Sequence, residues 1–316
     1  MSSSVLRYVL RRLAGLPVQL FCISLLAFIL VRLVPVEPAE VILRMSNLTP
    51  TEEAVASMRN ELGMDRSLPV QFANWLWKAS QFDFGNSFVS KTPVWSDVIG
   101  KFPATLRLAV TVIGLSLLIS IALGAFSALY KGGWFDQLCR LQSFIGISIP
   151  RYWLGFLLVY WFALKLDWLP TQGNHSWKHL ILPTLTLAFS QVAFLSRLLR
   201  ASMLENMKES YVQYARIRGI RESVILFRHI LPNSLLPIIT ATGVMFGHLL
   251  GGTVIVEQIF SLPGLGRFLI ESILNRDYPV IQCYVLLMAV VIVTINLIVD
   301  ILYRILDPRL NIKEGV

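Results

Sequence analysis

The chain has 316 residues, of which 55% are hydrophobic and only 15% are charged. A soluble domain carries about 25% charged residues, so the composition excludes an ordinary soluble fold of this size. The net charge of +9 does not require nucleic acid as a partner, because the basic residues flank long uncharged stretches, as the topology of membrane proteins demands. We therefore predict an all-α polytopic membrane protein in contact with lipids.

The uncharged stretches predict the membrane-spanning helices. Each is near or above the ~18 apolar residues that mark a spanning helix. A sixth span is less regular, because Pro150 and Arg151 interrupt it. The predicted six transmembrane helices lie at residues 13–31, 108–130, roughly 141–164, 180–196, 230–256 and 278–299.

The N-terminal third divides into two predicted parts. Residues 1–34 form a cytoplasmic N-terminus and the first spanning helix. We predict that this helix is not cleaved, because its apolar run is too long for a signal peptide. Residues 35–101 form a small periplasmic helical insertion. There, Thr49-Pro50-Thr51-Glu52 predicts a helix start with Pro50 at the first helical position. A second helix is predicted near Pro69, with one apolar face that contains Phe72, Trp75, Leu76 and Ala79.

Residues 102–316 form the predicted five-helix core. Small residues recur every four positions in two of its spans, a spacing that lets helix backbones approach closely in lipid. We interpret both series as helix packing surfaces, and direct contact with a transported solute is the alternative. The series are Ser116, Ser120, Gly124 and Ala128 in one span, and Gly243, Gly247 and Gly251 in the other.

The distribution of positive charge predicts the orientation. With the N-terminus placed in the cytoplasm, the inner segments hold 15 Lys and Arg residues and the longer outer segments hold 9. Cytoplasmic loops carry the excess of Lys and Arg, so both termini are predicted to lie in the cytoplasm. A basic loop at about 204–233 then lies on the same side, and its core at 211–232 is predicted to form two short helices bent at Gly219.

Ionisable side chains inside spans indicate candidate functional sites, because they are costly in a bilayer. His248 and Arg151 are of this kind, and together with Gly247 and Gly251 they are our candidates for a translocation path. The alternatives are an interhelical hydrogen bond for His248, and a carboxylate partner or backbone carbonyls for Arg151.

Two histidines on the outer side suggest a metal site. His175 and His179 are four residues apart, which on a helix places both on one face, as Ni²⁺, Cu²⁺ or Zn²⁺ would need. The alternative is an interfacial loop anchored by Trp177.

The sequence lacks the motifs of common catalytic sites. It contains no phosphate-binding loop, no nucleophile elbow, no His-Glu-x-x-His and no Cys-x-x-Cys. We therefore predict that the chain binds no cofactor and does not itself hydrolyse ATP. An intramembrane enzyme that uses His248 is the distant alternative.

The basic loop resembles the cytoplasmic EAA loop of ABC importer permeases. Ala215, Gly219 and Leu231-Pro232 match its spacing, whereas Gln213-Tyr214 departs from the Glu-Ala of the name. The chain is similar over nearly its whole length to the dipeptide, oligopeptide and nickel branch, and most similar to the first permease of nickel importers. Further matching stretches are residues 103–106, 148–150, 168–170, 198–203, 256–260, 263–266, 276–280 and 307–309.

The resemblance implies a type I ABC importer permease fold in the bacterial inner membrane. One chain would form half of an alternating-access path, and a homologous second permease would complete it. A periplasmic or lipid-anchored binding protein would deliver the solute, and two ATPase subunits would carry ATP and Mg²⁺. The implied cargo is nickel or a nickel–chelator complex, with dipeptides or oligopeptides as the alternative. The implied ATPase-coupling residues are Tyr211, Tyr214, Ala215, Arg216, Arg218, Gly219, Leu231 and Pro232.

Overall fold

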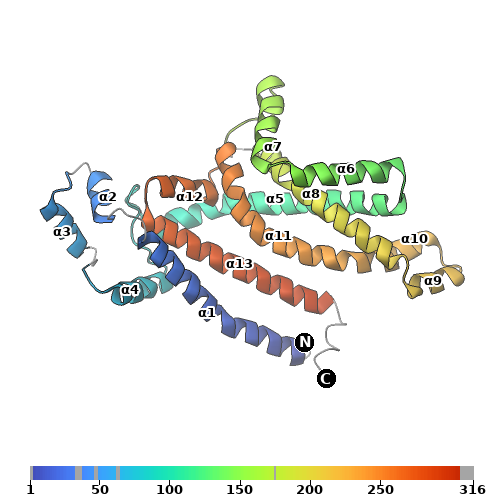
Figure 1. The fold of residues 1–316 in the computed structure, drawn as a ribbon, viewed down its shortest axis with the longest axis horizontal. Helices are drawn as coiled ribbons and strands as arrows, with labels where there is room; N and C mark the ends of the chain where they lie inside the picture. Colours follow the sequence, from blue (N-terminus) through green and yellow to red (C-terminus); the bar gives the residue numbers. More distant parts are fainter. Residues whose placement is uncertain (1–2, 33–37, 46–48, 62–64, 174–175, 307–316) are drawn as a thin grey trace. The chain divides into compact units, whose positions relative to one another are not determined.

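A computed structural model describes residues 3–32, 38–45, 49–61, 65–173 and 176–306. These residues are almost entirely helical (Figure 1), and their only β-pairing is an isolated bridge between Asn86 and Pro93. The elements are α1 (Ser3–Arg32), α2 (Pro38–Met45), α3 (Glu52–Glu61), α4 (Leu68–Ser80), α5 (Val94–Leu129), α6 (Trp134–Ser148), α7 (Arg151–Leu158), η1 (Val159–Lys165), α8 (Lys178–Asn206), α9 (Ser210–Ile217), α10 (Glu222–Ile225), η2 (Leu226–Ile230), α11 (Leu231–Ile259), α12 (Leu265–Leu274) and α13 (Tyr278–Leu306).

Apolar helices occupy the positions that hydropathy predicts. Among the described residues, four helices are long and apolar enough to cross a membrane: Val94–Leu129, Lys178–Asn206, Glu222–Ile259 and Tyr278–Ile301. The bent pair of α6 with α7 and η1 gives a fifth segment, and Ala14–Ile29 in α1 is a shorter apolar stretch. The all-helical, multi-span prediction is therefore confirmed, with α1 and the bent pair as its least regular members.

The span predicted at roughly 141–164 is not one straight helix. Its two halves meet at 105°, between Ser148 and Arg151. Pro150 lacks an N–H and disfavours helical geometry in the residue before it. Ile149 accordingly adopts an extended conformation with φ −77° and ψ 125°.

One compact unit comprises Met1–Val9, Thr105–Leu262 and Thr294–Val316. Helix α8 is its centre and packs against α6, α7 and α11. Gly124 and Gly243 permit close packing as predicted: a Cβ at Gly124 would lie 2.9 Å from the carbonyl oxygen of Ser196 on α8, and one at Gly243 would clash with Val299 of α13. Gly251 of the same series differs, since nothing lies within 4 Å of an added Cβ there. The core of this unit is thus a set of tightly apposed spanning helices.

The second compact unit comprises Leu10–Ala104 and Pro263–Val293. Phe72 and Trp75, on the predicted apolar face of α4, contact Phe28 of α1 with ring centroids 5.2 and 6.0 Å apart. Ser87 and the backbone N–H of Phe88 both donate hydrogen bonds to the Asp277 carboxylate, at 2.5 and 3.1 Å. The segment that follows the first helix is therefore tied to the residues just before α13.

Two local boundaries differ from the predicted ones. Helix α3 begins at Glu52, and the hydroxyl of Thr51 accepts a hydrogen bond from the N–H of Ala54 at 3.3 Å, so Thr51 is the cap and Pro50 lies outside the helix. Helix α5 begins at Val94, so the predicted boundary between residues 101 and 102 falls inside a continuous helix. Charged residues at positions 97, 101 and 107 hide this part of the helix from a hydropathy scan.

Candidate functional site

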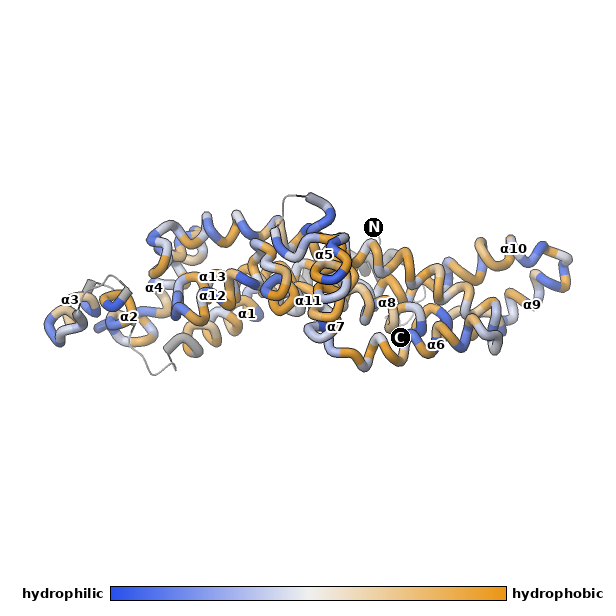
Figure 2. The backbone as a smooth tube through the Cα atoms, turned by 90° about the horizontal axis from the view of Figure 1, so that it is seen from above, coloured by the Kyte–Doolittle hydropathy of each residue, from blue (hydrophilic) through white to orange (hydrophobic). Residues whose placement is uncertain are grey.

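The basic loop folds into a compact helical element at one end of α8 and α11 (Figure 1). We call residues 210–230, which comprise α9, the turn after it, α10 and η2, the α9–α10 element. In Figure 2 its tip is hydrophilic, whereas the neighbouring spanning helices are largely hydrophobic. A polar helical element at the end of apolar helices is suited to contact with an aqueous partner.

The turn after α9 is a helix-terminating Schellman motif. The N–H of Gly219 bonds to the carbonyl of Arg216 at 2.9 Å, and the N–H of Ile220 bonds to that of Ala215 at 3.2 Å. Gly219 has φ +73°, a left-handed conformation that glycine adopts without the Cβ penalty. The predicted bend at Gly219 is therefore confirmed.

The inner side of the α9–α10 element packs against α8. Val212 and Ala215, three residues apart on α9, are both buried. They belong to one hydrophobic cluster with residues of α8, α10, η2 and α11, so the inner side of the element is part of the core of the bundle. The other buried members are Ala128, Leu195, Leu199, Met203, Ile225, Ile230 and Ile238.

The outer side presents large apolar groups among basic ones. Ile217 is 81% exposed, and Tyr214 and Phe227 are also largely exposed. Arg216 donates a hydrogen bond to Glu222 at 2.8 Å, across the turn. This bond raises the pKa of the Arg216 guanidinium above its usual range. The surface thus combines exposed apolar side chains with fixed positive charge. The exposed arginines of the element are Arg216, Arg218, Arg221 and Arg228.

Tyr211 bridges the two ends of the loop, which we call its neck. Its hydroxyl donates to the side-chain oxygen of Asn206, at the end of α8, with a distance of 2.9 Å. The same hydroxyl accepts a hydrogen bond from the amide of Asn233, in the first turn of α11, at 3.3 Å. One side chain therefore links the two spanning helices between which the α9–α10 element is inserted.

The second of the two short helices predicted within 211–232 is not separate from the span that follows it. Residues Glu222–Ile259 form one continuous helical run, in which η2 is a wide π-helical turn with a bond from the N–H of Leu231 to the carbonyl of Leu226. Pro232 has no N–H to donate and would clash with a carbonyl in a regular helix interior. A π-bulge at this point accommodates the proline without a break.

A buried ion pair beside this site was not predicted from the sequence. Asp136, near the start of α6, is fully buried and accepts hydrogen bonds from Nε and Nη2 of Arg200 at 2.6 and 2.8 Å. Ser127 and the N–H of Gly132 complete its shell at 2.6 and 2.9 Å. Arg200 belongs to α8, one turn before Met203 of the cluster under α9. The only sequence signal for this pair was that Arg200 lies in the stretch 198–203, which matches the family.

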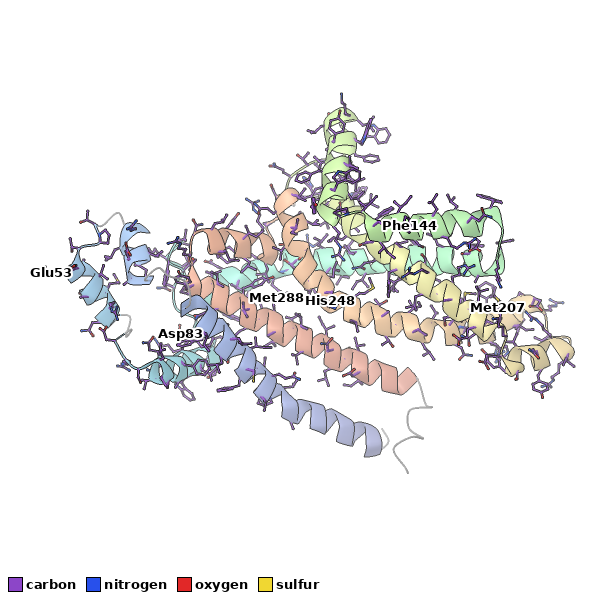
Figure 3. All side chains as sticks on the ribbon, in the orientation of Figure 1. Glu53, Asp83, Phe144, Met207, His248 and Met288 are labelled. Atoms are coloured by element: carbon purple, nitrogen blue, oxygen red, sulfur yellow. The ribbon has the colours of Figure 1, made fainter. Side chains whose placement is uncertain are left out.

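The four candidate path residues lie in the first compact unit. His248 is exposed on α11 (Figure 3), Gly247 is buried, and Gly251 is exposed with open space around it. Arg151 begins α7 and its Nη1 lies 2.6 Å from the position of a Cβ at Gly252. The structure therefore brings the side chain of Arg151, from α7, against the helix α11 that carries the other three.

The candidate metal residues are only partly described. His175 lies outside the described residues. His179, in the first turn of α8, has its Nδ1 2.9 Å from the hydroxyl of Ser176. In the described part of the chain, no group of three or more His, Cys, Asp or Glu side chains is placed to hold a metal ion.

Comparison with known proteins identifies the family. Residues 120–312 match the family described as "Binding-protein-dependent transport system inner membrane component", and residues 5–109 match its N-terminal counterpart. The glutathione transport system permease protein GsiC of Escherichia coli K12 is 39% identical over 98% of this chain and its own full length. The protein of the same name from Pectobacterium atrosepticum is 40% identical over the same shares.

A solved structure supports the same fold. An inward-facing MetNI methionine ABC transporter chain superimposes with a TM-score of 0.56 at 16% identity, covering 66% of this chain and 96% of that one. At this identity the likeness concerns the fold alone. On the family match and the full-length relatives, the chain belongs to the inner-membrane components of binding-protein-dependent transport systems, the permease subunits of ABC importers.

Proposed function

We propose that this permease subunit forms half of the path of an importer for small peptides of the glutathione class. The observation that carries the proposal is the 39–40% identity, over full length, to permeases named for glutathione transport. Peptides were the alternative cargo in the sequence interpretation, and the relatives favour them over nickel or a nickel–chelator complex.

Family membership defines the subunit's role in general terms. It is a multi-pass, non-catalytic component of the inner membrane, and ATP hydrolysis takes place on separate ATPase subunits. We propose that the remaining partners are a homologous second permease and a periplasmic or lipid-anchored binding protein. In this assembly, alternating access would follow from closure of the ATPase pair.

We further propose that the α9–α10 element receives the motion of an ATPase subunit. Its exposed Ile217, Tyr214 and Phe227 form an apolar surface of the kind that soluble partners cover. Its inner side is fixed to α8 by Val212 and Ala215. A partner that pushes on the outer side would therefore move α8 and α11 together.

The proposed orientation places this element in the cytoplasm. It follows from the excess of Lys and Arg in the segments assigned to the inside. Both chain termini are then cytoplasmic, and the helices of residues 35–101 lie in the periplasm.

A paired uptake assay tests the cargo. In cells that lack the chromosomal gene, the gene would be restored together with its partner subunits, and uptake of radiolabelled glutathione and of nickel would be measured side by side. We expect restored glutathione uptake and unchanged nickel uptake. A variant of the partner ATPase without its phosphate-binding lysine is the control for uptake that does not use ATP.

The opposite result decides against the proposal. Restored nickel uptake without any gain in glutathione or dipeptide uptake would transfer the cargo assignment to the metal, and would leave the permease assignment intact.

A further inference from the structure

Arg151 is placed against the C-terminal part of α11 by the bend before α7. It is the first residue of α7 and directly follows Pro150. Its Nη1 lies 2.6 Å from where a Cβ at Gly252 would be, so a larger residue at position 252 would require this guanidinium to shift. The glycine at this position therefore makes room for a guanidinium beside the α11 backbone.

This guanidinium has no acidic partner in the described part of the chain. Asp136 is bound to Arg200, and Glu257, the acidic residue of α11, accepts a hydrogen bond from Thr105 at 2.7 Å. Residues 230–256 contain no charged side chain apart from the ionisable His248. A cation among spanning helices is costly unless an anion or a wet cavity compensates it. Arg151 is itself exposed, so its guanidinium is open to water and to an anion from outside the described chain.

A second polar group lies one turn away on α11. His248 precedes Gly252 by four residues, which is about 6 Å along the helix axis. It is exposed and forms no hydrogen bond with the described residues. Gly251, beside it, has nothing within 4 Å of an added Cβ. The exposed positions recur at helical spacing on one open face: Val244, His248, Gly251, Ile255 and Gln258.

We propose that Arg151 and His248 bind a carboxylate of the cargo as it passes α11. The planar guanidinium donates two parallel hydrogen bonds to a carboxylate, and the imidazole adds a further donor. Gly251 leaves the space that the ligand needs. The inference rests on the proposed peptide cargo, since every peptide of this class carries at least one free carboxylate, whereas a bare divalent cation is repelled by Arg151.

The test uses the complete transporter, with the binding protein, the second permease and the ATPases. Arg151→Gln, Arg151→Lys, His248→Leu and the control Lys131→Gln would be compared for glutathione uptake and for co-purification of all subunits. Lys131 is an exposed residue in the turn between α5 and α6, far from α11 in the sequence.

The expected result is graded. Arg151→Gln lowers uptake about tenfold or more, because a charge-assisted pair is lost, while the subunits still co-purify. Arg151→Lys retains part of the activity, His248→Leu loses less than Arg151→Gln, and Lys131→Gln transports as the wild type does.

Three results would overturn the carboxylate site, and they differ in what else they overturn. Normal uptake by Arg151→Gln rejects the site alone. Loss of the second permease from purified Arg151→Gln shows that the anion is a carboxylate of that subunit. A wild-type complex that imports nickel but no peptide rejects both the site and the peptide cargo.

Discussion

At the scale of single residues, the hydrogen bonds of Tyr211 and the Asp136–Arg200 pair lie at or near the base of the α9–α10 element. The Tyr211 hydroxyl joins Asn206 and Asn233 at its neck. The Asp136–Arg200 pair fixes α8 to the turn between α5 and α6, one helical turn from the cluster under α9. Both act on the seating of the element, and neither belongs to its outer surface.

Removal of the Tyr211 hydroxyl should loosen the neck. In Tyr211→Phe two hydrogen bonds are lost, at about 1 kcal/mol of net stability each. We expect amide hydrogen exchange of residues 210–217 to become at least about fivefold faster in the purified transporter. Tyr214→Phe is the matched control, since Tyr214 is 68% exposed. Equal amide exchange rates in the two variants would show that the hydrogen bonds of Tyr211 do not stabilise the element.

Loss of the Asp136 charge should destabilise the chain itself. Asp136→Asn leaves Arg200, whose side chain is only 21% exposed, without its anion. Breaking a buried pair in this way costs about 3 kcal/mol. We expect a lower thermal midpoint and a lower yield in membranes.

A second arginine near Asp136 provides the comparison. Arg140 lies 3.8 Å from the same carboxylate but is 56% exposed, so Arg140→Gln should cost less than about 1 kcal/mol. Equal losses in the Asp136→Asn and Arg140→Gln variants would contradict the assignment of Arg200 as the main partner.

At the scale of elements, the turn at Gly219 sets the direction in which α10 leaves α9. Its φ of +73° is accessible to Gly and tolerated by Asn, but strained for a β-branched residue. No atom lies within 4 Å of an added Cβ, so backbone conformation and not side-chain size determines what fits here.

Two substitutions at Gly219 separate conformation from bulk. Gly219→Val should cost about 1–2 kcal/mol in this turn and reduce uptake strongly at unchanged membrane levels. Gly219→Asn, which is of similar size, should retain most of the uptake. Immunoblots of the membrane fraction would accompany the uptake measurement. A fully active Gly219→Val variant would mean that coupling does not depend on this turn.

At the scale of the whole molecule, the proposed orientation is open to direct chemical labelling. Val89 is exposed in the segment assigned to the periplasm, and Lys131 is exposed in a turn assigned to the cytoplasm. In a Cys22→Ser background, where the remaining Cys139 and Cys283 are buried, single cysteines at these two positions would report the sidedness.

An impermeant maleimide should modify Val89→Cys in spheroplasts and leave Lys131→Cys unmodified until the membrane is inverted. The reverse pattern would place both termini in the periplasm and would exclude an ATPase from the α9–α10 element. Alkylation of the unfolded protein by the same reagent is the control for cysteine reactivity.

Local signals in the sequence were sufficient for much of the fold. Uncharged runs of about twenty residues gave the positions of the spans, because transfer into lipid depends on composition over such a window. Gly219 predicted the turn, because the hydrogen bonds of its Schellman motif join only neighbouring residues. The apolar spacing of Phe72 and Trp75 likewise gave the face of α4 that contacts α1.

Features that depend on tertiary contacts were beyond the sequence. Asp136 and Arg200 are 64 residues apart in the chain, and nothing local pairs them. Arg151 and Gly252 meet only because the chain turns by 105° after Ser148. In both cases the missing information was the packing of one helix on another. The predicted break between the second short helix and the following span is absent for a local reason, because the π-bulge of η2 carries the helix through Pro232.

The bend between α6 and α7 has a consequence for hydration. Helix α6 has 15 residues and is therefore about 22 Å long, less than the ~30 Å of a hydrocarbon core. Beyond it, Pro150 offers no N–H to the carbonyl of Gly146. Lipid cannot solvate such a group, so protein or water must do so. The bend therefore places a backbone acceptor within the span, and we expect a protein group or a water molecule to hydrogen-bond it even without cargo.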